Sequence, residues 1–206
     1  DCHERDWVPD QEMIFGTDCH FDWKTIYSIL EPYFNNSLPR LKQVLLADYN
    51  GKLRHNMQPL YSYIHEYFNV KNIVPIQNEQ LIQYSCEMPN NLKYDLKTNT
   101  GKILLQKTIQ KFDLGNLITD KKQGFSVNTV NLWNNYGKEI FLYYFDNSRL
   151  IQDKIINSDW IEKHISKNDL DSRYVNKFLG ILALEIWYRL FVTNELDSNE
   201  KLQFKK

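Results

Sequence analysis

The chain has 206 residues, of which 42% are hydrophobic and 14% aromatic, so it can bury the core of an ordinary domain and is not intrinsically disordered. Its 25 Lys and Arg nearly balance 26 Asp and Glu, which argues against a dedicated nucleic-acid binder, because such proteins carry a basic excess. Residues 1–100 carry a net charge of −4 and residues 101–206 a net charge of +3, which leaves room for an anionic small molecule near the second half.

In chain order, the sequence begins with its least periodic stretch, residues 1–23. Within it Met13-Ile14-Phe15 is a short apolar run that ends at Gly16, and we interpret it as a buried strand. Helical periodicity starts at Lys24, and proline sets several of the later boundaries. The predicted helices cover residues 24–32, 39–49, 53–68 (with a kink or break at Pro59), 81–84 (stopped by Pro89), 103–109, 130–145 and 160–165, with a loop over 113–127.

The strongest predicted element is a helix over residues 174–191. Its apolar residues recur in pairs every four positions, which makes one broad apolar stripe. Asp171 lies just before this helix and is expected to be its N-cap. Because such stripes normally pack inward, we expect Phe178, Leu182 and Trp187 to be buried. The polar tail 197–206 is expected to fray.

These segments predict a mainly α fold with at most one or two strands. The chain has no internal repeat and no low-complexity tract, so we expect a single helical body over residues 1–206. The most apolar run, Phe178 to Val192, is interrupted by Glu185 and Arg189 and is too short to span a bilayer. We therefore expect no membrane span.

Cysteine content indicates the compartment. Three cysteines cannot form a closed disulfide framework, and no secretory signal opens the chain, so a reducing, cytoplasmic setting is expected. The chain begins at Asp1 rather than Met, which we interpret as the mark of a fragment or a processed product.

Asp-Cys-His occurs twice, at Asp1-Cys2-His3 and Asp18-Cys19-His20. Two Cys and two His match the ligand set of a tetrahedral zinc. Zinc ribbons and fingers, however, separate the ligands of each half by two or more residues, whereas adjacent Cys and His side chains point apart. We therefore predict no metal site here. His55, His65 and His164 stand singly and are expected at the surface or as satisfied core residues.

Two segments carry candidate chemistry. In Thr100–Lys107, Lys102 is expected in the first turn of a helix, where the helix dipole disfavours a cation. Beside free backbone N–H groups, that lysine is instead suited to holding a phosphate. In the loop Lys121-Lys122-Gln123-Gly124-Phe125, two cations precede a glycine that permits close backbone approach. Solvated surface charge is the alternative interpretation of both segments.

These segments belong to an ordered series of short motifs. The series runs Val74-Pro75-Ile76-Gln77-Asn78, Leu81-Ile82, Met88-Pro89, Gly101-Lys102-Ile103-Leu104-Leu105, Lys122-Gln123-Gly124-Phe125, Leu132-Trp133 and Leu184-Glu185-Ile186-Trp187-Tyr188-Arg189. In order and spacing it resembles the C-terminal part of the synthetase domain of glutamine-hydrolysing asparagine synthetases. That family has V-P-F-L-D, L-V, L-P, T-K-Y-L-L-R, K-x-G-F and L-W in succession, with a closing L-E-L-W-L-R. The resemblance covers residues 45–195.

The resemblance implies a fold: the helical C-terminal portion of an α/β ATP-pyrophosphatase-type (adenine nucleotide α-hydrolase-like) synthetase domain. It also implies a ligase that activates aspartate, or a similar carboxylic acid, with ATP and Mg²⁺ as a β-aspartyl adenylate. Ammonia from glutamine then attacks this adenylate. Lys102 matches the family lysine beside the reacting carbonyl and phosphate, where a cation stabilises developing negative charge. The residues implied near the ATP phosphates are Lys121, Lys122, Gln123 and Gly124.

The sequence departs from the family in several motifs. The family's D-R-x-S-M falls on Ser62-Tyr63-Ile64-His65-Glu66, without the acid and the arginine, and V-P-F-L-D ends in Asn78. The acidic G-x-G-x-D-E loop has only a distorted counterpart at residues 16–22. The S-G-G-x-D-S pyrophosphate loop and the N-terminal cysteine glutaminase have none. We therefore expect a fragment of a longer, divergent synthetase, whose partners include the missing N-terminal half or the glutaminase domain. The Mg²⁺ ligands are then expected outside this chain.

A second class of function stays open: a catalytically degenerate helical interaction module derived from the same domain. The lost acidic motifs favour this module, whereas the retained Lys102 and the loop at Lys122–Phe125 favour the enzyme. Nucleic-acid binding through aromatics and lysines is disfavoured, because the charge is balanced and no base-stacking motif occurs.

Overall fold

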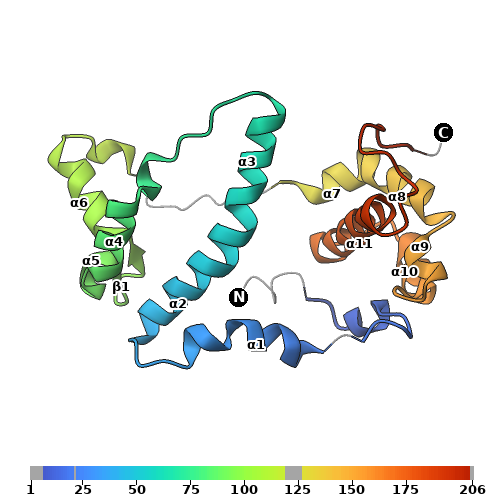
Figure 1. The fold of residues 1–206 in the computed structure, drawn as a ribbon, viewed down its shortest axis with the longest axis horizontal. Helices are drawn as coiled ribbons and strands as arrows, with labels where there is room; N and C mark the ends of the chain where they lie inside the picture. Colours follow the sequence, from blue (N-terminus) through green and yellow to red (C-terminus); the bar gives the residue numbers. More distant parts are fainter. Residues whose placement is uncertain (1–6, 21, 119–126, 205–206) are drawn as a thin grey trace. The chain divides into compact units, whose positions relative to one another are not determined.

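The computed structural model describes residues 7–20, 22–118 and 127–204 (Figure 1). Helices make up most of these residues, and the only paired strands among them are the two-residue β1 and β2, so the predicted mainly α fold is confirmed. None of the described helices is long and apolar enough to cross a bilayer. The prediction of a single body was wrong, because the chain forms two compact units: residues 1–21 with 123–206 (unit 1), and residues 22–122 (unit 2).

Unit 1 joins the N-terminal segment to the C-terminal helices. Its elements are η1 (Gln11–Ile14), α7 (Thr129–Leu132), η5 (Trp133–Gly137), α8 (Lys138–Phe145), α9 (Arg149–Gln152), α10 (Ser158–Ile165) and α11 (Ser172–Phe191). The predicted helix over 130–145 is confirmed, although its middle turn, η5, is a π-helix. The segment around Trp160 is helical as predicted. Periodicity cannot reveal which distant helices a terminal segment will join, and this is why the sequence missed the division into units.

The strand predicted at Met13–Phe15 was wrong in its type. Gln11–Ile14 forms a 3₁₀ turn, and Phe15 makes a single antiparallel bridge with Ile156. Ile14 is nevertheless buried. Gly16 packs so closely that a Cβ there would lie 2.0 Å from the Lys154 carbonyl oxygen, so only glycine fits. The apolar run before Gly16 therefore indicated a buried segment and a close backbone contact at the glycine, and not a strand of a sheet.

Aromatic rings fill the core of unit 1. Phe141, Trp160 and Phe178 are fully buried, and Trp133 is nearly so. Phe178 lies at the centre, with its ring centroid 5.0 Å from those of Trp133 and Phe141 and 5.2 Å from that of Trp160. Val8 from the N-terminal segment is also fully buried in this core.

The long C-terminal helix α11 confirms most of what its periodicity predicts. It spans Ser172–Phe191, and Asp171 is its N-cap, accepting hydrogen bonds from the backbone N–H groups of Arg173 and Tyr174. Phe178 and Leu182 are buried as expected, but Trp187 is 50% exposed, so that prediction was wrong. Trp187 follows Phe178 by about two and a half helical turns and therefore lies on the opposite face. The broad stripe of α11 covers two faces, and only one of them packs within unit 1.

A buried carboxylate ties α11 to the helices beside it. Glu185 is fully buried and accepts hydrogen bonds from the Ser148 hydroxyl (2.7 Å) and from the backbone N–H groups of Arg149 (2.8 Å) and Leu150 (3.1 Å). Its charge is balanced by Arg189, whose Nε lies 2.6 Å from Oε1. Arg189 also donates to the carbonyl oxygen of Tyr144 at 2.9 Å. This network fixes the start of α9 and the end of α8 on α11.

We predict that Glu185→Gln destabilises unit 1 by about 3–5 kcal/mol, because removing one partner of a buried ion pair leaves the other charge uncompensated. Denaturant unfolding followed by fluorescence of the buried Trp133 and Trp160 measures this loss. Glu195→Gln is the matched control: it removes an ion pair with Arg149 at the surface, where solvent already screens the charges, and should change stability little. Equal stability of wild type and Glu185→Gln would contradict this role.

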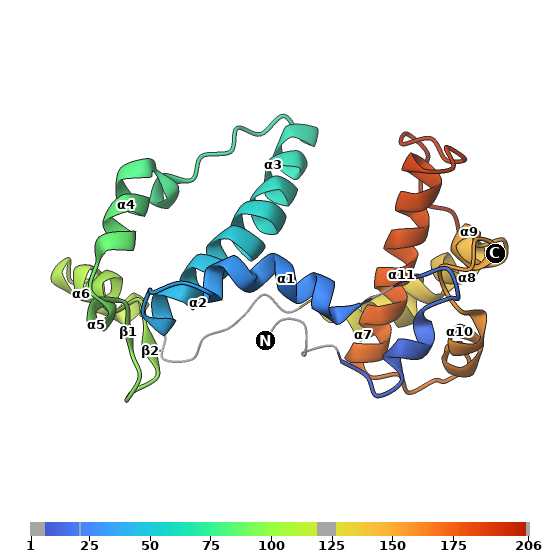
Figure 2. The same ribbon diagram turned by 60° about the horizontal axis from the view of Figure 1, so that its bottom comes forward.

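Unit 2 is a chain of helices interrupted by one hairpin. Its elements are α1 (Trp23–Phe34), α2 (Arg40–Asp48), η2 (Tyr49–Met57), α3 (Gln58–Tyr67), η3 (Pro75–Gln77), α4 (Glu79–Glu87), α5 (Asn90–Lys93), β1 (Tyr94–Asp95), β2 (Thr100–Gly101), α6 (Ile103–Lys111) and η4 (Gly115–Leu117). The predicted helices are all present, with Pro32 near the end of α1 and Pro39 capping α2. The break predicted at Pro59 does not occur: the π-helix η2 leads directly into α3, and α2, η2 and α3 form one continuous helical segment (Figure 2).

The described part of unit 2 has no buried core. None of its described side chains is fully buried, whereas every buried hydrophobic residue that the structure describes belongs to unit 1. The exposure is most pronounced on α3, where Leu60, Tyr63, Ile64 and Tyr67 are exposed at helical spacing. Apolar surface on this scale is typical of interaction surfaces rather than of a complete domain.

Candidate functional site

The predicted catalytic lysine lies where the hairpin of unit 2 meets α6. Strands β1 and β2 pair antiparallel, with Tyr94 opposite Gly101 and Asp95 opposite Thr100. The turn between them is held by Asp95, which accepts hydrogen bonds from the Lys97 N–H (2.9 Å) and the Thr98 hydroxyl (2.8 Å). Both hydrogen bonds lower the pKa of Asp95 below its usual value, and the bond from the Lys97 N–H has the larger effect. Lys102 directly follows the second strand of the hairpin.

Lys102 adopts a left-handed backbone conformation (φ 55°, ψ 34°). It is the N-cap of α6 and not a first-turn residue, so the sequence placed it one position too far into the helix. A left-handed conformation costs an ordinary L-residue about 1–2 kcal/mol, so the surrounding structure must hold it. Gln106 does so, because its N–H donates to the Lys102 carbonyl and its side chain to the Gly101 carbonyl, both at 2.9 Å. The lysine side chain itself is exposed.

A groove of about 820 Å³ lies beside this lysine within unit 2. Its lining includes Thr100, Ile103 and Lys107, all from the predicted segment. Asn90, Tyr94 and Leu41 of α2 also line it. Sequence reasoning missed Asn90 and Tyr94, because only the folding of the hairpin brings α5 against α6.

The groove is lined by two lysines, Lys97 and Lys107, and one acid, Asp95. The Asp95 carboxylate is engaged in its own turn, whereas Lys97 and Lys107 have no ion pair among the described residues. Burial, and then the nearby charge of Lys42, lowers the pKa of Lys93, which precedes the lining residue Tyr94. The buried Oδ1 of Asn90 has no hydrogen-bond donor. The groove lining therefore holds two lysines without an ion pair among the described residues and one carboxylate, whereas Asn90 Oδ1 is shielded from solvent.

The second predicted site lies outside the described residues. Lys121, Lys122, Gln123 and Gly124 all belong to the segment 119–126, so their assignment to the ATP phosphates stays a prediction. The same holds for Cys2 and His3 of the first Asp-Cys-His. Among the described residues, no three His, Cys, Asp or Glu side chains gather as metal ligands would.

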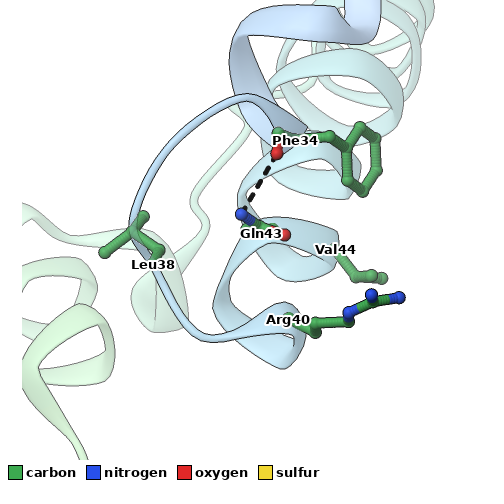
Figure 3. A pocket seen from close by; sticks show the side chains of 5 residues that line it. All are labelled: Phe34, Leu38, Arg40, Gln43 and Val44. Carbon is green, nitrogen blue, oxygen red and sulfur yellow. Dashed lines mark hydrogen bonds between the residues drawn. The ribbon is translucent and has the colours of Figure 1, made fainter.

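A further pocket of about 560 Å³ lies between α1 and α2 (Figure 3). Phe34, Leu38 and Val44 supply its apolar lining, and Arg40 its charge. The side chain of Gln43 bridges the two helices by donating to the Phe34 carbonyl at 3.2 Å. Arg40 is the one charged residue in this lining.

A cluster of charged and titratable side chains lies in unit 1, around Asp10. His164, which is 2% exposed, contacts Asp10 Oδ2 through Nε2 at 2.7 Å, and the Lys163 ammonium reaches the same oxygen at 3.0 Å. The other ring nitrogen, Nδ1, lies 3.1 Å from Lys167 Nζ, which makes Nδ1 the acceptor and places the ring proton on Nε2. His164 is thus a satisfied core residue, one of the two alternatives that the sequence left open.

Asp10 binds its partners as a carboxylate. Burial raises its pKa, but hydrogen bonds from His164 and Lys163 outweigh burial and hold the pKa far below its ordinary value. The Trp160 indole adds to this effect from nearby, without reaching full hydrogen-bond geometry. No cavity adjoins the cluster among the pockets described above, and its evident role is to fasten the N-terminal segment to α10 and α11.

Comparison with family models, with curated proteins and with solved structures finds no match to this chain.

We predict that acid weakens unit 1 through Asp10. Because the pKa of Asp10 is depressed in the folded state, its carboxylate stabilises the fold above the ordinary Asp pKa, near 4, and loses that contribution as the pH falls further. Asp10→Asn should lower stability at pH 7, and its difference from wild type should shrink below about pH 4. Denaturant unfolding at stepped pH measures both, with the exposed Asp169→Asn as control. A difference that stays constant down to pH 2 would contradict the prediction.

Proposed function

We propose that this chain forms part of an ATP-dependent amide-forming ligase of the asparagine synthetase type, as the helical C-terminal portion of its α/β ATP-pyrophosphatase-type synthetase domain. The observation that carries the proposal is the conformation of Lys102. A lysine held in a strained backbone conformation, with its ammonium exposed at the start of a helix, contributes nothing evident to stability. Functional sites are one place where such strain is kept. Of the two left-handed lysines among the described residues, Lys102 and Lys154, Lys102 is the one in a segment that resembles the family motif.

In this proposal Lys102 stabilises negative charge on the reacting groups. The carboxylate of aspartate, or of a similar acid, attacks the α-phosphate of ATP, and pyrophosphate leaves as the acyl adenylate forms. Ammonia from glutamine then attacks the acyl carbon and releases AMP. An ammonium fixed beside the carbonyl and phosphate oxygens lowers the barrier, because it is already oriented when the charge develops. The lysines of the 121–124 loop are assigned to the phosphates.

ATP in such a ligase is bound as its Mg²⁺ complex. The described residues offer no cluster of acids for the ion, so we assign the Mg²⁺ ligands to another part of the enzyme. The exposed apolar side chains of α3 are consistent with this assignment. They are suited to burial against the α/β portion of the enzyme, which would carry the Mg²⁺ ligands.

We predict that Lys102→Ala, in the enzyme that contains this chain, lowers ATP-dependent amide formation by about two to three orders of magnitude, the usual effect of losing one preorganised electrostatic donor. Lys102→Gly should lose as much activity and yet raise stability by about 1 kcal/mol, since glycine adopts the left-handed conformation without strain. The measurements are pyrophosphate release with ATP and aspartate, amide formation with glutamine, and denaturant unfolding.

Lys154→Gly is the matched control, because Lys154 is also a left-handed lysine (φ 55°) but lies in unit 1. It should gain stability and keep full activity. Unchanged turnover in Lys102→Ala would exclude the catalytic assignment. Absence of pyrophosphate release from the wild-type enzyme would exclude the ligase.

A second function, a helical interaction module, is favoured because the described residues of unit 2 form no buried core. Such a module holds its helices by local hydrogen bonds and completes its packing only against a partner. We predict that the chain alone binds a hydrophobic dye, and that amides of α3 exchange with solvent at least tenfold faster than those of α11, because little tertiary packing protects α3. Equal protection of the two helices would show a packed unit 2 and contradict this alternative.

A further inference from the structure

The outward face of α11 carries no charged side chain over about four turns. Phe178, Leu182 and Glu185 lie on the buried face of the helix. The opposite face is an outer stripe made of Asn176, Gly180, Ala183, Leu184, Trp187 and Phe191, all of which except the half-buried Asn176 are exposed. The solvent face of a helix normally carries charged residues, so an exposed stripe without them is typical of a contact surface.

Packing within unit 1 does not explain the glycine at position 180. A Cβ built on Gly180 meets no described atom within 4 Å, so the fold leaves room there for a larger residue. Glycine in a helix interior is nevertheless less stable than alanine. On an exposed apolar stripe, a glycine permits a side chain of another molecule to approach the helix backbone closely. Gly180 therefore fits a contact made from outside unit 1.

The outer stripe is complementary to itself in an antiparallel pair. Its midpoint falls between Ala183 and Leu184. Gly180 and Trp187 lie equally far on either side of that midpoint, and so do Asn176 and Phe191. When a twofold axis passes through the midpoint, each large side chain of one helix faces a smaller residue of the other, and the largest, Trp187, faces glycine. A contact of this kind is isologous, because both copies use the same patch.

Charge and size agree with such a pair. Lys177 borders the outer stripe and has no ion pair among the described residues. Antiparallel pairing places it beside Leu190 of the other copy, at the carboxyl end of α11, where the helix dipole favours a cation. The stripe is about 22 Å long. One pair of helices of this length buries less than the roughly 1,200–2,000 Å² of a standard interface, which suits a weak dimer.

We infer that the outer stripe of α11 docks against the same stripe of a second copy of this chain, with the two helices antiparallel and Trp187 of each copy over Gly180 of the other. α11 contains none of the residues proposed for catalysis or for binding the phosphates, so the inference does not rest on the ligase reaction.

Sedimentation equilibrium of the whole chain should show a reversible monomer–dimer equilibrium with a micromolar dissociation constant. Trp187→Ala should raise this constant about tenfold or more, because a central tryptophan is a typical hot spot. Gly180→Trp should raise it as much, because two indoles then compete for one space. The matched controls are Trp7→Ala, since Trp7 is 48% exposed against 50% for Trp187, and Gly51→Trp, since a Cβ at Gly51 also meets nothing within 4 Å. Both controls should leave the constant unchanged.

A mixture of the two stripe variants tests the geometry itself. The new indole of Gly180→Trp fits the space left by Trp187→Ala, and the native Trp187 of the first variant lies over the native Gly180 of the second. We therefore expect the mixture to form a heterodimer about tenfold tighter than either variant forms alone. Circular dichroism checks that each variant folds, and Gly180→Leu replaces Gly180→Trp if that variant does not.

Three outcomes would overturn the inference. A wild type that stays monomeric at millimolar concentration would assign the outer stripe to another part of the same chain or of the enzyme. Controls that weaken the dimer as much as the stripe variants would place the contact elsewhere. A mixture no tighter than its components would exclude the antiparallel pairing of Trp187 with Gly180.

Discussion

The packing of unit 1 depends on the buried carboxylate of Glu185. It accepts the Ser148 hydroxyl and the first amides of α9, while Arg189 balances its charge and reaches the Tyr144 carbonyl at the end of α8. Three helices therefore meet at one side chain. A buried charge is tolerated only when paired and fully hydrogen-bonded, so these helices have little freedom to move apart without exposing it. The aromatic core around Phe178 then packs against a fixed framework.

The described part of unit 2 is held by local hydrogen bonds and not by a buried network. Local devices define its elements: Asn78 caps α4, Asp95 closes the hairpin turn, and Gln106 holds the start of α6. None of these devices buries apolar area, and the side chains that could form a core remain exposed. Secondary structure of this kind is marginal without tertiary packing. This contrast is why both proposed functions give unit 2 a partner, and why its polar surfaces are open to ligands.

The strained backbone of Lys102 and the lysines beside it lie at one end of unit 2. Lys102 holds a costly backbone conformation, and the lysines of the neighbouring groove, Lys97 and Lys107, have no ion pair among the described residues. In unit 1, by contrast, the charged groups around Asp10 and Glu185 satisfy one another. Buried polar atoms without a partner occur in both units, so they do not single out a site. The charged clusters of unit 1 are structural, and the strained backbone of Lys102 marks the end of unit 2 as the candidate site.

Much of this protein was decided by local sequence. The mainly α fold, the N-cap at Asp171 and the helices after Pro39 and Gly101 follow from periodicity and capping, which act over a few residues. Lys102 was singled out because it was expected in the first turn of a helix, and the structure places it one residue earlier, at the N-cap. Tertiary structure alone decided that residues 7–20 join the C-terminal helices, that Trp187 faces outward, and that Asn90 meets α6 across the hairpin. These outcomes depend on which apolar faces meet across long stretches of chain, and periodicity reports that a face is apolar without reporting what covers it.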